Sequence, residues 1–334
     1  MTPSNETQTA HIAGATVAGR PRRGGANGLT FLQNHAVAIM TLILVIGVTL
    51  ANPNFLSYLN LANMLSQWAP AGLMAVGMTF VVIAGGFDLS IAAIFSLSSV
   101  VAAIAAEAMG VPVALVAALL VGGLVGAVNA SLIARLDINP FITTVGTGFI
   151  VTGVTFVVTG NAAFFVSAPG FGVLGAGRLM GFPYSGMLLI AVLILSAVIL
   201  HKSVFGHQVF AVGGNPEASR LSGLNVPLVI GSTYALLGAL AGLAGLISAS
   251  QLSSAQAVMD PNILFDVLTI VIVGGTPLGG GIGSIWRTCV GLILIATISN
   301  GFVLLDISPS YQNIIKGCLI VGALALDSLL KRLR

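Results

Sequence analysis

The feature that most constrains this chain is a succession of long apolar runs with very little charge between them. Of 334 residues, 57% are hydrophobic and 6% are charged, whereas soluble domains carry about 25% charged residues. Such a chain cannot cover a water-facing surface of its own size, so it must lie in a bilayer. The runs are Ala36–Ala51, Leu61–Ile83, Leu89–Ala106, Val111–Ile133, Ile138–Val158, Met187–Leu200, Val226–Ile247, Ile263–Val273, Ile285–Ile298 and Ile314–Leu330.

These runs predict an all-α polytopic membrane protein with about ten transmembrane helices. Most of them approach the roughly 20 residues that cross about 30 Å of hydrocarbon. A β-barrel would show short alternating segments instead. The exception is Ile263–Val273, which contains Asp266. At about 1.5 Å per residue it reaches only half way across, so it either borrows flanking residues or forms a re-entrant element.

The distribution of positive charge favours ten complete crossings with both termini cytoplasmic. Cytoplasmic loops of membrane proteins are enriched in Lys and Arg. If every run crosses from a cytoplasmic N-terminus, Arg135, Lys202, Arg220 and Arg287 all fall inside. If the eighth run only dips into the bilayer, Arg287 and the C-terminal basic cluster move outside. Under ten crossings, Thr159–Ser185 is the largest external segment and the loop of residues 202–225 the largest internal one between spans.

Two domains follow from the composition. Residues 1–28 are rich in Thr, Ala, Gly and Ser, and their arginines at positions 20, 22 and 23 hold them on the cytoplasmic side. We expect a disordered cytoplasmic tail here, followed by a transmembrane domain over residues 29–334. Cys289 and Cys318 lie inside apolar runs and are expected to be buried free thiols, with no disulfide or metal implied.

The most polar stretch in the internal loop, Gly213–Gly223, carries complete helix punctuation. Asn215 can cap free N–H groups, Pro216 suits the first helical position, and Glu217 meets the positive end of the helix dipole. Gly223 can end the helix in a left-handed conformation. The predicted two-turn helix, Pro216–Ser222, is too short to be stable alone and needs a docking surface. Ala218 and Leu221 form its apolar face, although an ordinary amphipathic loop helix has the same pattern.

Two glycine-rich bends interrupt the apolar sequence at membrane depth. In the first, Asp88 follows Gly85 and Gly86. It is either a functional acid or, as we favour, part of a helix start at which Asp88 or Ser90 caps the helix. The second, Gly274–Gly283, lacks the Gly-Lys-Ser/Thr ending of a phosphate loop, so no ATP site is expected on this chain. Irregular backbone at this depth survives only where it is packed in protein or lines a cavity.

The two bends also resemble each other, since Val82–Leu89 parallels Val271–Leu278. Either chance in a glycine-rich chain or a duplicated half explains this echo. Three polar residues, Asn129, Asn300 and Gln312, lie in or beside spans. We favour interhelical hydrogen bonds as their role; contact with a polar solute is the functional alternative.

The sequence offers no catalytic site. It contains no Ser-His-Asp arrangement, no His-Glu-x-x-His motif and no carboxylate pair at useful spacing. A proton-coupled carrier usually needs a relay of intramembrane ionisable groups, and Asp266 alone makes no relay.

Four stretches resemble a known family, the membrane permeases of ribose/xylose-type ABC importers for monosaccharides. They are Gly85–Ser90, Ile138–Thr147, Gly213–Gly223 and Gly274–Ser284. The similarity runs from about Phe55 to the C-terminus. One departure is Leu89-Ser90-Ile91-Ala92, where the family usually continues Leu-Ser-Val-Gly; this change affects local packing at the bend.

The resemblance implies a multi-pass bacterial inner-membrane protein that pairs with a second copy of itself. A periplasmic sugar-binding protein would deliver the solute, and a separate ABC ATPase subunit would hydrolyse ATP. The chain itself would bind no cofactor, metal or nucleic acid. The alternatives are a branched-chain amino-acid ABC permease and a stand-alone secondary carrier.

By the same resemblance, the short internal helix would couple the permease to the ATPase. The coupling candidates are Asn215, Pro216, Glu217, Ala218, Arg220, Leu221 and Gly223. The candidates for the translocation path or its gate are Gly85, Gly86, Asp88, Asn129, Phe141, Gly274, Gly275, Thr276 and Asn300.

Overall fold

The computed structural model describes residues 27–332, which are mostly helical, as the apolar runs predict. The helices are α1 (Asn27–Ala51), α2 (Tyr58–Gln67), α3 (Ala69–Ile83), α4 (Ile91–Met109), α5 (Val111–Leu136), α6 (Pro140–Thr159), α7 (Val173–Ala176), α8 (Tyr184–Lys202), α9 (Val204–Gly214), α10 (Pro216–Leu221), α11 (Val226–Leu252), α12 (Ile263–Val273), α13 (Ile285–Leu304) and α14 (Pro309–Arg332). A 3₁₀ helix, η1, covers Pro53–Leu56. Four two-residue strands, which the sequence did not predict, are β1 (Phe164–Phe165), β2 (Arg178–Leu179), β3 (Phe182–Pro183) and β4 (Ser254–Ala255).

Among the described residues, six helices are long and apolar enough to cross a membrane: α4, α5, α6, α8, α11 and α13. The run Leu61–Ile83 forms two helices, α2 and α3, which meet at Trp68 with a bend of 51°. Pro70 stands in the first turn of α3 and cannot donate the N–H that a continuous helix needs there. If this pair is one span, it makes a seventh. The chain is therefore a multi-pass membrane protein.

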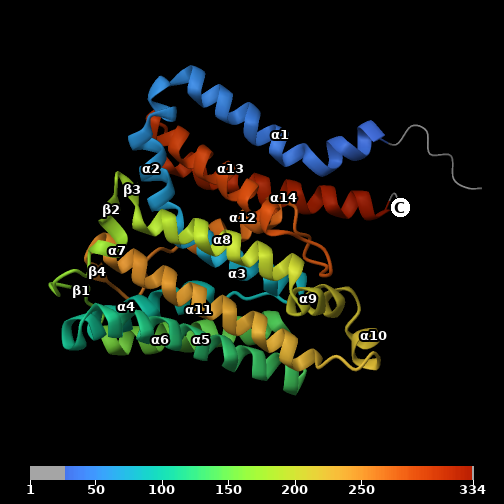
Figure 1. Cartoon of the computed structure of the whole chain (residues 1–334), viewed down its shortest axis with the longest axis horizontal. Coiled ribbons are helices and arrows are strands. Elements are labelled where there is room, and N and C mark those ends of the chain that lie inside the picture. Colours follow the sequence, from blue (N-terminus) through green and yellow to red (C-terminus); the bar gives the residue numbers. More distant parts are fainter. Residues whose placement is uncertain (1–26, 333–334) are drawn as a thin grey trace, which may run out of the picture. The chain divides into compact units, whose positions relative to one another are not determined.

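The core is centred on α11, which packs against α5, α4 and α3 (Figure 1). Glycines allow α5 and α11 to touch through their backbones. A Cβ on Gly122 would lie 2.1 Å from the carbonyl oxygen of Gly238, and one on Gly238 would lie 2.1 Å from that of Gly122. Small residues at a helix interface are how membrane helices gain van der Waals contact without a hydrophobic driving force.

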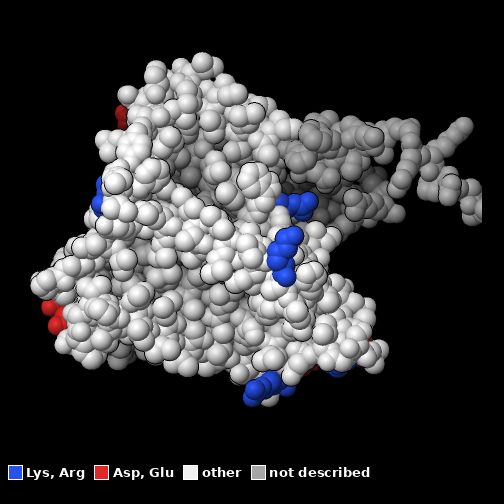
Figure 2. All heavy atoms as spheres, in the orientation of Figure 1, with Lys and Arg blue, Asp and Glu red and all other residues white. Residues whose placement is uncertain are grey.

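The long helices run between two ends that differ in structure (Figure 1). At one end, here called the strand end, β1 pairs antiparallel with β4, and β2 with β3. The opposite end, here called the coupling end, holds α9, α10 and both glycine-rich bends. Figure 2 shows that charged side chains are sparse on the visible face and lie toward its ends, with a white band between them. That band is what a hydrocarbon layer requires.

Of the predicted tail, residues 1–26 lie outside the described range, while Asn27 and Gly28 begin α1. The internal loop 202–225 contains two helices, α9 and α10, where one was expected. Both cysteines are free, but only Cys289 is partly buried; Cys318 is exposed, so the expectation of two buried thiols is wrong for Cys318.

Candidate coupling and translocation site

The short helix of the internal loop forms as its punctuation predicts. The Asn215 side chain accepts a hydrogen bond from the Ala218 backbone N–H at 2.9 Å, with Pro216 in the first turn. The helix ends at Leu221, one residue earlier than expected, and Gly223 then takes a left-handed conformation with φ of +85°. Glu217 and Arg220 form an exposed ion pair at 3.3 Å, a kind that contributes little to stability.

The outward side of α10 carries two apolar side chains beside the exposed ion pair of Glu217 and Arg220. Ala218 is exposed and Leu221 is 81% exposed, while Ser219 is buried. A helix of six residues would normally turn a leucine inward to gain hydrophobic stabilisation. The apolar side chain of Leu221 is thus left exposed beside Ala218 on the capped helix.

The first glycine-rich bend closes α3 with a left-handed glycine. Gly85 has φ of +84°, and the Gly86 N–H bonds to the carbonyl of Val81 at 2.8 Å, which satisfies a helix-end carbonyl. Gly86 needs space more than a special conformation, because a Cβ there would lie 2.7 Å from the hydroxyl oxygen of Tyr234.

Asp88 is fully buried in a polar cluster behind this bend. Its Oδ1 accepts hydrogen bonds from the Ser90 N–H at 2.8 Å and the Ser90 hydroxyl at 2.6 Å. Asn129 of α5 donates to Asp88 Oδ2 at 3.3 Å and to Ser90 Oγ at 2.8 Å. Neither Asp88 nor Ser90 caps α4, since Ser90 occupies the N-cap position without a side-chain cap bond. The cap interpretation is thus wrong; Asp88 instead holds the bend itself together.

Two further side chains clamp the same bend and were missed by sequence reasoning. The Tyr234 hydroxyl accepts from the Phe87 N–H at 3.1 Å and donates to the Phe87 carbonyl at 3.0 Å. The Thr144 hydroxyl of α6 accepts from the Leu89 N–H at 3.0 Å. Helices α5, α6 and α11 thus each contribute a polar group to one bend, which satisfies the backbone that irregular structure frees.

The second bend closes α12 in the same way. Gly275 has φ of +98°, and the Thr276 N–H bonds to the carbonyl of Val271 at 3.1 Å. The structure therefore matches Gly275 with Gly85, one residue out of the register that the sequence echo suggested. Both bends thus end their helices with the same geometry. Arg287 adds a hydrogen bond from Nη1 to the carbonyl of Gly275 at 3.1 Å.

The remaining path candidates do not converge on one site. Thr276 is buried and its hydroxyl has no hydrogen-bond partner, and Gly274 lies against the backbone of Arg287. Phe141, in the first turn of α6, is 58% exposed. Asn300 exchanges two amide hydrogen bonds with Asn60 of α2, at 2.9 and 3.0 Å. For Asn300 the structure therefore gives the interhelical role.

A buried ion pair joins α12 and α14. Lys316 Nζ of α14 lies 2.6 Å from Oδ1 of Asp266 on α12, and the side chains are 11% and 10% exposed. The contact is an ion pair by distance, although Oδ1 accepts no well-aligned hydrogen bond. The ammonium also lies 5.6 Å from the centre of the Trp68 ring, at the bend between α2 and α3, within cation–π range.

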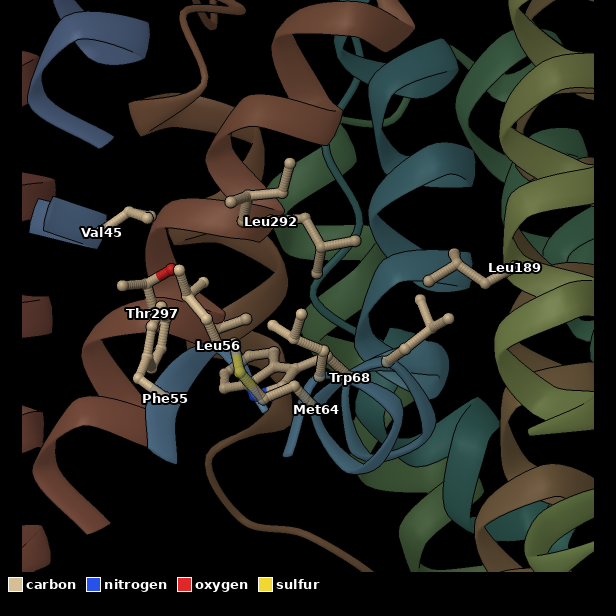
Figure 3. A pocket seen from close by; sticks show the side chains of 12 residues that line it. Val45, Phe55, Leu56, Met64, Trp68, Leu189, Leu292 and Thr297 are labelled. Atoms are coloured by element: carbon tan, nitrogen blue, oxygen red, sulfur yellow. The ribbon is translucent and has the colours of Figure 1, made fainter. Parts of the chain in front are cut away.

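An apolar cavity of about 230 Å³ lies between η1, α2, α8 and α13, near the strand end. Figure 3 shows carbon-rich side chains directed into it, with the Thr297 hydroxyl as a polar exception. Such a lining does not suit a polyhydroxylated solute, which needs several convergent hydrogen-bonding groups.

Comparison with known proteins decides the family. The family model described as "Branched-chain amino acid transport system / permease component" matches residues 60–324. The chain belongs to this permease family. It is 39% identical to the ribose import permease protein RbsC of Bacillus subtilis, over 85% of this chain and 89% of that one. It is 33% identical to the galactose/methyl galactoside import permease protein MglC of Escherichia coli, over 90% and 96%.

A third relative is the L-arabinose transport system permease protein AraH of Escherichia coli, 32% identical over 92% of this chain and 94% of that protein. No solved structure matches the chain. The resemblance drawn from the four motifs is thus confirmed: this chain belongs to the same permease family as these sugar import permeases, and it is a multi-pass membrane protein.

Proposed function

We propose that this permease forms the translocation path of an ABC importer for a monosaccharide. The similarity to sugar import permeases over 85–92% of the chain carries the proposal. The printed description of the family names branched-chain amino acids, but the three relatives named above are permeases for ribose, galactose and arabinose. This favours a sugar over an amino acid as the solute.

The proposed topology has ten crossings, with the coupling end in the cytoplasm. The path of the chain around α12 supports a crossing there. Before α12, β4 pairs with β1 at the strand end. After α12, Gly281 donates a hydrogen bond to Ile83 at the coupling end. The 11 helical residues of α12 and the non-helical residues on either side of them therefore connect the two ends. A re-entrant segment would instead begin and finish at the same end.

Charge supports the orientation. Arg135 ends α5, Lys202 ends α8 and Arg220 lies in α10, all at the coupling end, where Arg287 also contacts the second bend. Under the positive-inside rule that end faces the cytoplasm. The strand end then faces the periplasm and would receive a sugar-binding protein, while a second copy of the chain would complete the path.

The proposed contact with the ATPase is the outward face of α10. Replacing Ala218 with Asp adds a charge where a partner must exclude water, which costs several kcal/mol, on the order of 2–5. We expect the tagged Ala218→Asp permease to reach the membrane but to lose the ATPase on purification in mild detergent. The matched control is Ala176→Asp, the same change at an exposed alanine near the strand end. If Ala218→Asp retains the ATPase as the control does, α10 is not the docking element.

A further inference from the structure

Three glycine segments from separate parts of the chain meet backbone to backbone at the coupling end. They are Gly85 of the first bend, Gly213 near the end of α9, and Gly280 and Gly281 of the second bend; together they are called the glycine junction. A Cβ on Gly280 would lie 2.6 Å from the carbonyl oxygen of Gly213 and 3.0 Å from Cα of Gly85. The Gly281 N–H donates to the carbonyl of Ile83, the last residue of α3, at 2.8 Å.

Gly213 lies at the centre of these contacts. A Cβ on Gly213 would be 1.7 Å from the carbonyl oxygen of Ile83 and 2.7 Å from the backbone nitrogen of Gly281. Both obstacles are backbone atoms, so no side chain can swing away to make room. Gly213 is helical and does not have a positive φ. Glycine is therefore required at this position by contact and not by conformation.

The junction is joined directly to the short helix α10. Gly214 is the last residue of α9, Asn215 follows as the cap, and Pro216 begins α10. A second contact ties α9 to α3, because the Phe205 and Phe80 rings stack with centroids 6.2 Å apart. A displacement of α10 would therefore move the end of α9. Because the junction connects α9 to the end of α3 and to the second bend, both of these would move with it.

Resting on the proposed function, we infer that Gly213 is a positioning residue for transport. It seats the coupling loop on both glycine-rich bends, so that one movement of α10 shifts both. The first bend is held by buried groups, including Asp88 of the bend and Tyr234 of α11, and Arg287 of α13 donates a hydrogen bond to the second bend. A movement at the junction is therefore transmitted to the helical core, because a closely packed interior is hardly compressible and passes strain on.

Adjacent glycines provide the test. Gly214 has nothing within 4 Å of a built Cβ, and both residues lie in the last turn of α9, so Gly214→Ala is a matched control for Gly213→Ala. With the permease, ATPase and binding protein in proteoliposomes, we expect Gly213→Ala to keep the ATPase bound but to lower sugar uptake per ATP hydrolysed by about tenfold, because overpacking of this kind is not relieved locally. Gly214→Ala should remain within about twofold of the unmodified permease.

Equal uptake per ATP in Gly213→Ala and Gly214→Ala would overturn the inference. If Gly213→Ala fails to assemble, Phe205→Leu provides the test instead. This change weakens the ring contact between α9 and α3 without adding bulk at the junction. Reduced uptake per ATP in that variant supports the inference, and unchanged uptake per ATP overturns it. Failure of the proposed function is separate: it would appear as an unmodified complex that moves none of ribose, galactose or arabinose.

Discussion

Replacing only one partner of the ion pair between Asp266 and Lys316 should destabilise the permease far more than replacing both partners with apolar residues. In Lys316→Met, the Asp266 carboxylate loses its counter-ion in a site where its side chain is 10% exposed. Removing one partner of a buried pair costs about 3–5 kcal/mol, whereas replacing both by apolar side chains is neutral or stabilising by about 1–4 kcal/mol. Asp266→Leu alone should be similarly destabilising, and Asp266→Leu/Lys316→Met should recover stability.

The magnitude follows from the surroundings of the pair. Among the described residues, Asp266 is the only ion-pair partner of Lys316, whose ammonium also lies near the face of Trp68. Burial of both side chains weakens screening by water, so neither charge is compensated once the other is gone.

The thermal stability of the variants can be ranked by heating each purified protein. Size-exclusion chromatography then measures the fraction that stays monodisperse. We expect both single variants to denature well below the unmodified permease and the double variant to match or exceed it. Single variants as stable as the double variant would refute this reasoning, because the two charges would then be solvated independently.

Two further predictions concern topology and the first bend. A cysteine at Ala176 should react with a membrane-impermeant thiol reagent in intact spheroplasts, whereas one at Ser222, exposed at the coupling end, should react only after permeabilisation; labelling of both in intact cells would contradict the orientation. Tyr234→Phe leaves the Phe87 N–H and carbonyl without their partner, which should cost about 1–3 kcal/mol of stability. The same change at exposed Tyr311 should cost nothing measurable, and equal loss in both would contradict the clamp.

Much of the fold could be predicted from the chain because lipid enforces a simple rule. Every long apolar run had to become a helix, since no other element satisfies its own backbone in hydrocarbon. The run Ile263–Val273 matches α12 at both ends. The ends of α10 could also be predicted from the sequence, because Asn215, Pro216 and Gly223 affect only the backbone next to them.

What could not be predicted depends on contacts between distant segments. The bend at Trp68 had a signal in Pro70, but its size is set by packing. The residues next to Asp88 in the sequence predict a helix cap, but its hydrogen-bond partners include Asn129, 41 residues away. The glycine junction joins residues near 85, 213 and 280. No local pattern distinguishes Gly213, which is wedged between two backbones, from Gly214, where an added Cβ would meet nothing within 4 Å.

Uptake by the reconstituted complex tests the central claim most directly. The permease should be placed in proteoliposomes with its ATPase on the side of the coupling end and a sugar-binding protein on the side of the strand end. Radiolabelled D-ribose, D-galactose and L-arabinose are then offered, with leucine as the competing solute. The account predicts uptake of a monosaccharide that requires both ATP and the binding protein, and no uptake of leucine. Uptake by the permease alone under an ion gradient, or ATP-driven uptake of leucine only, would contradict it.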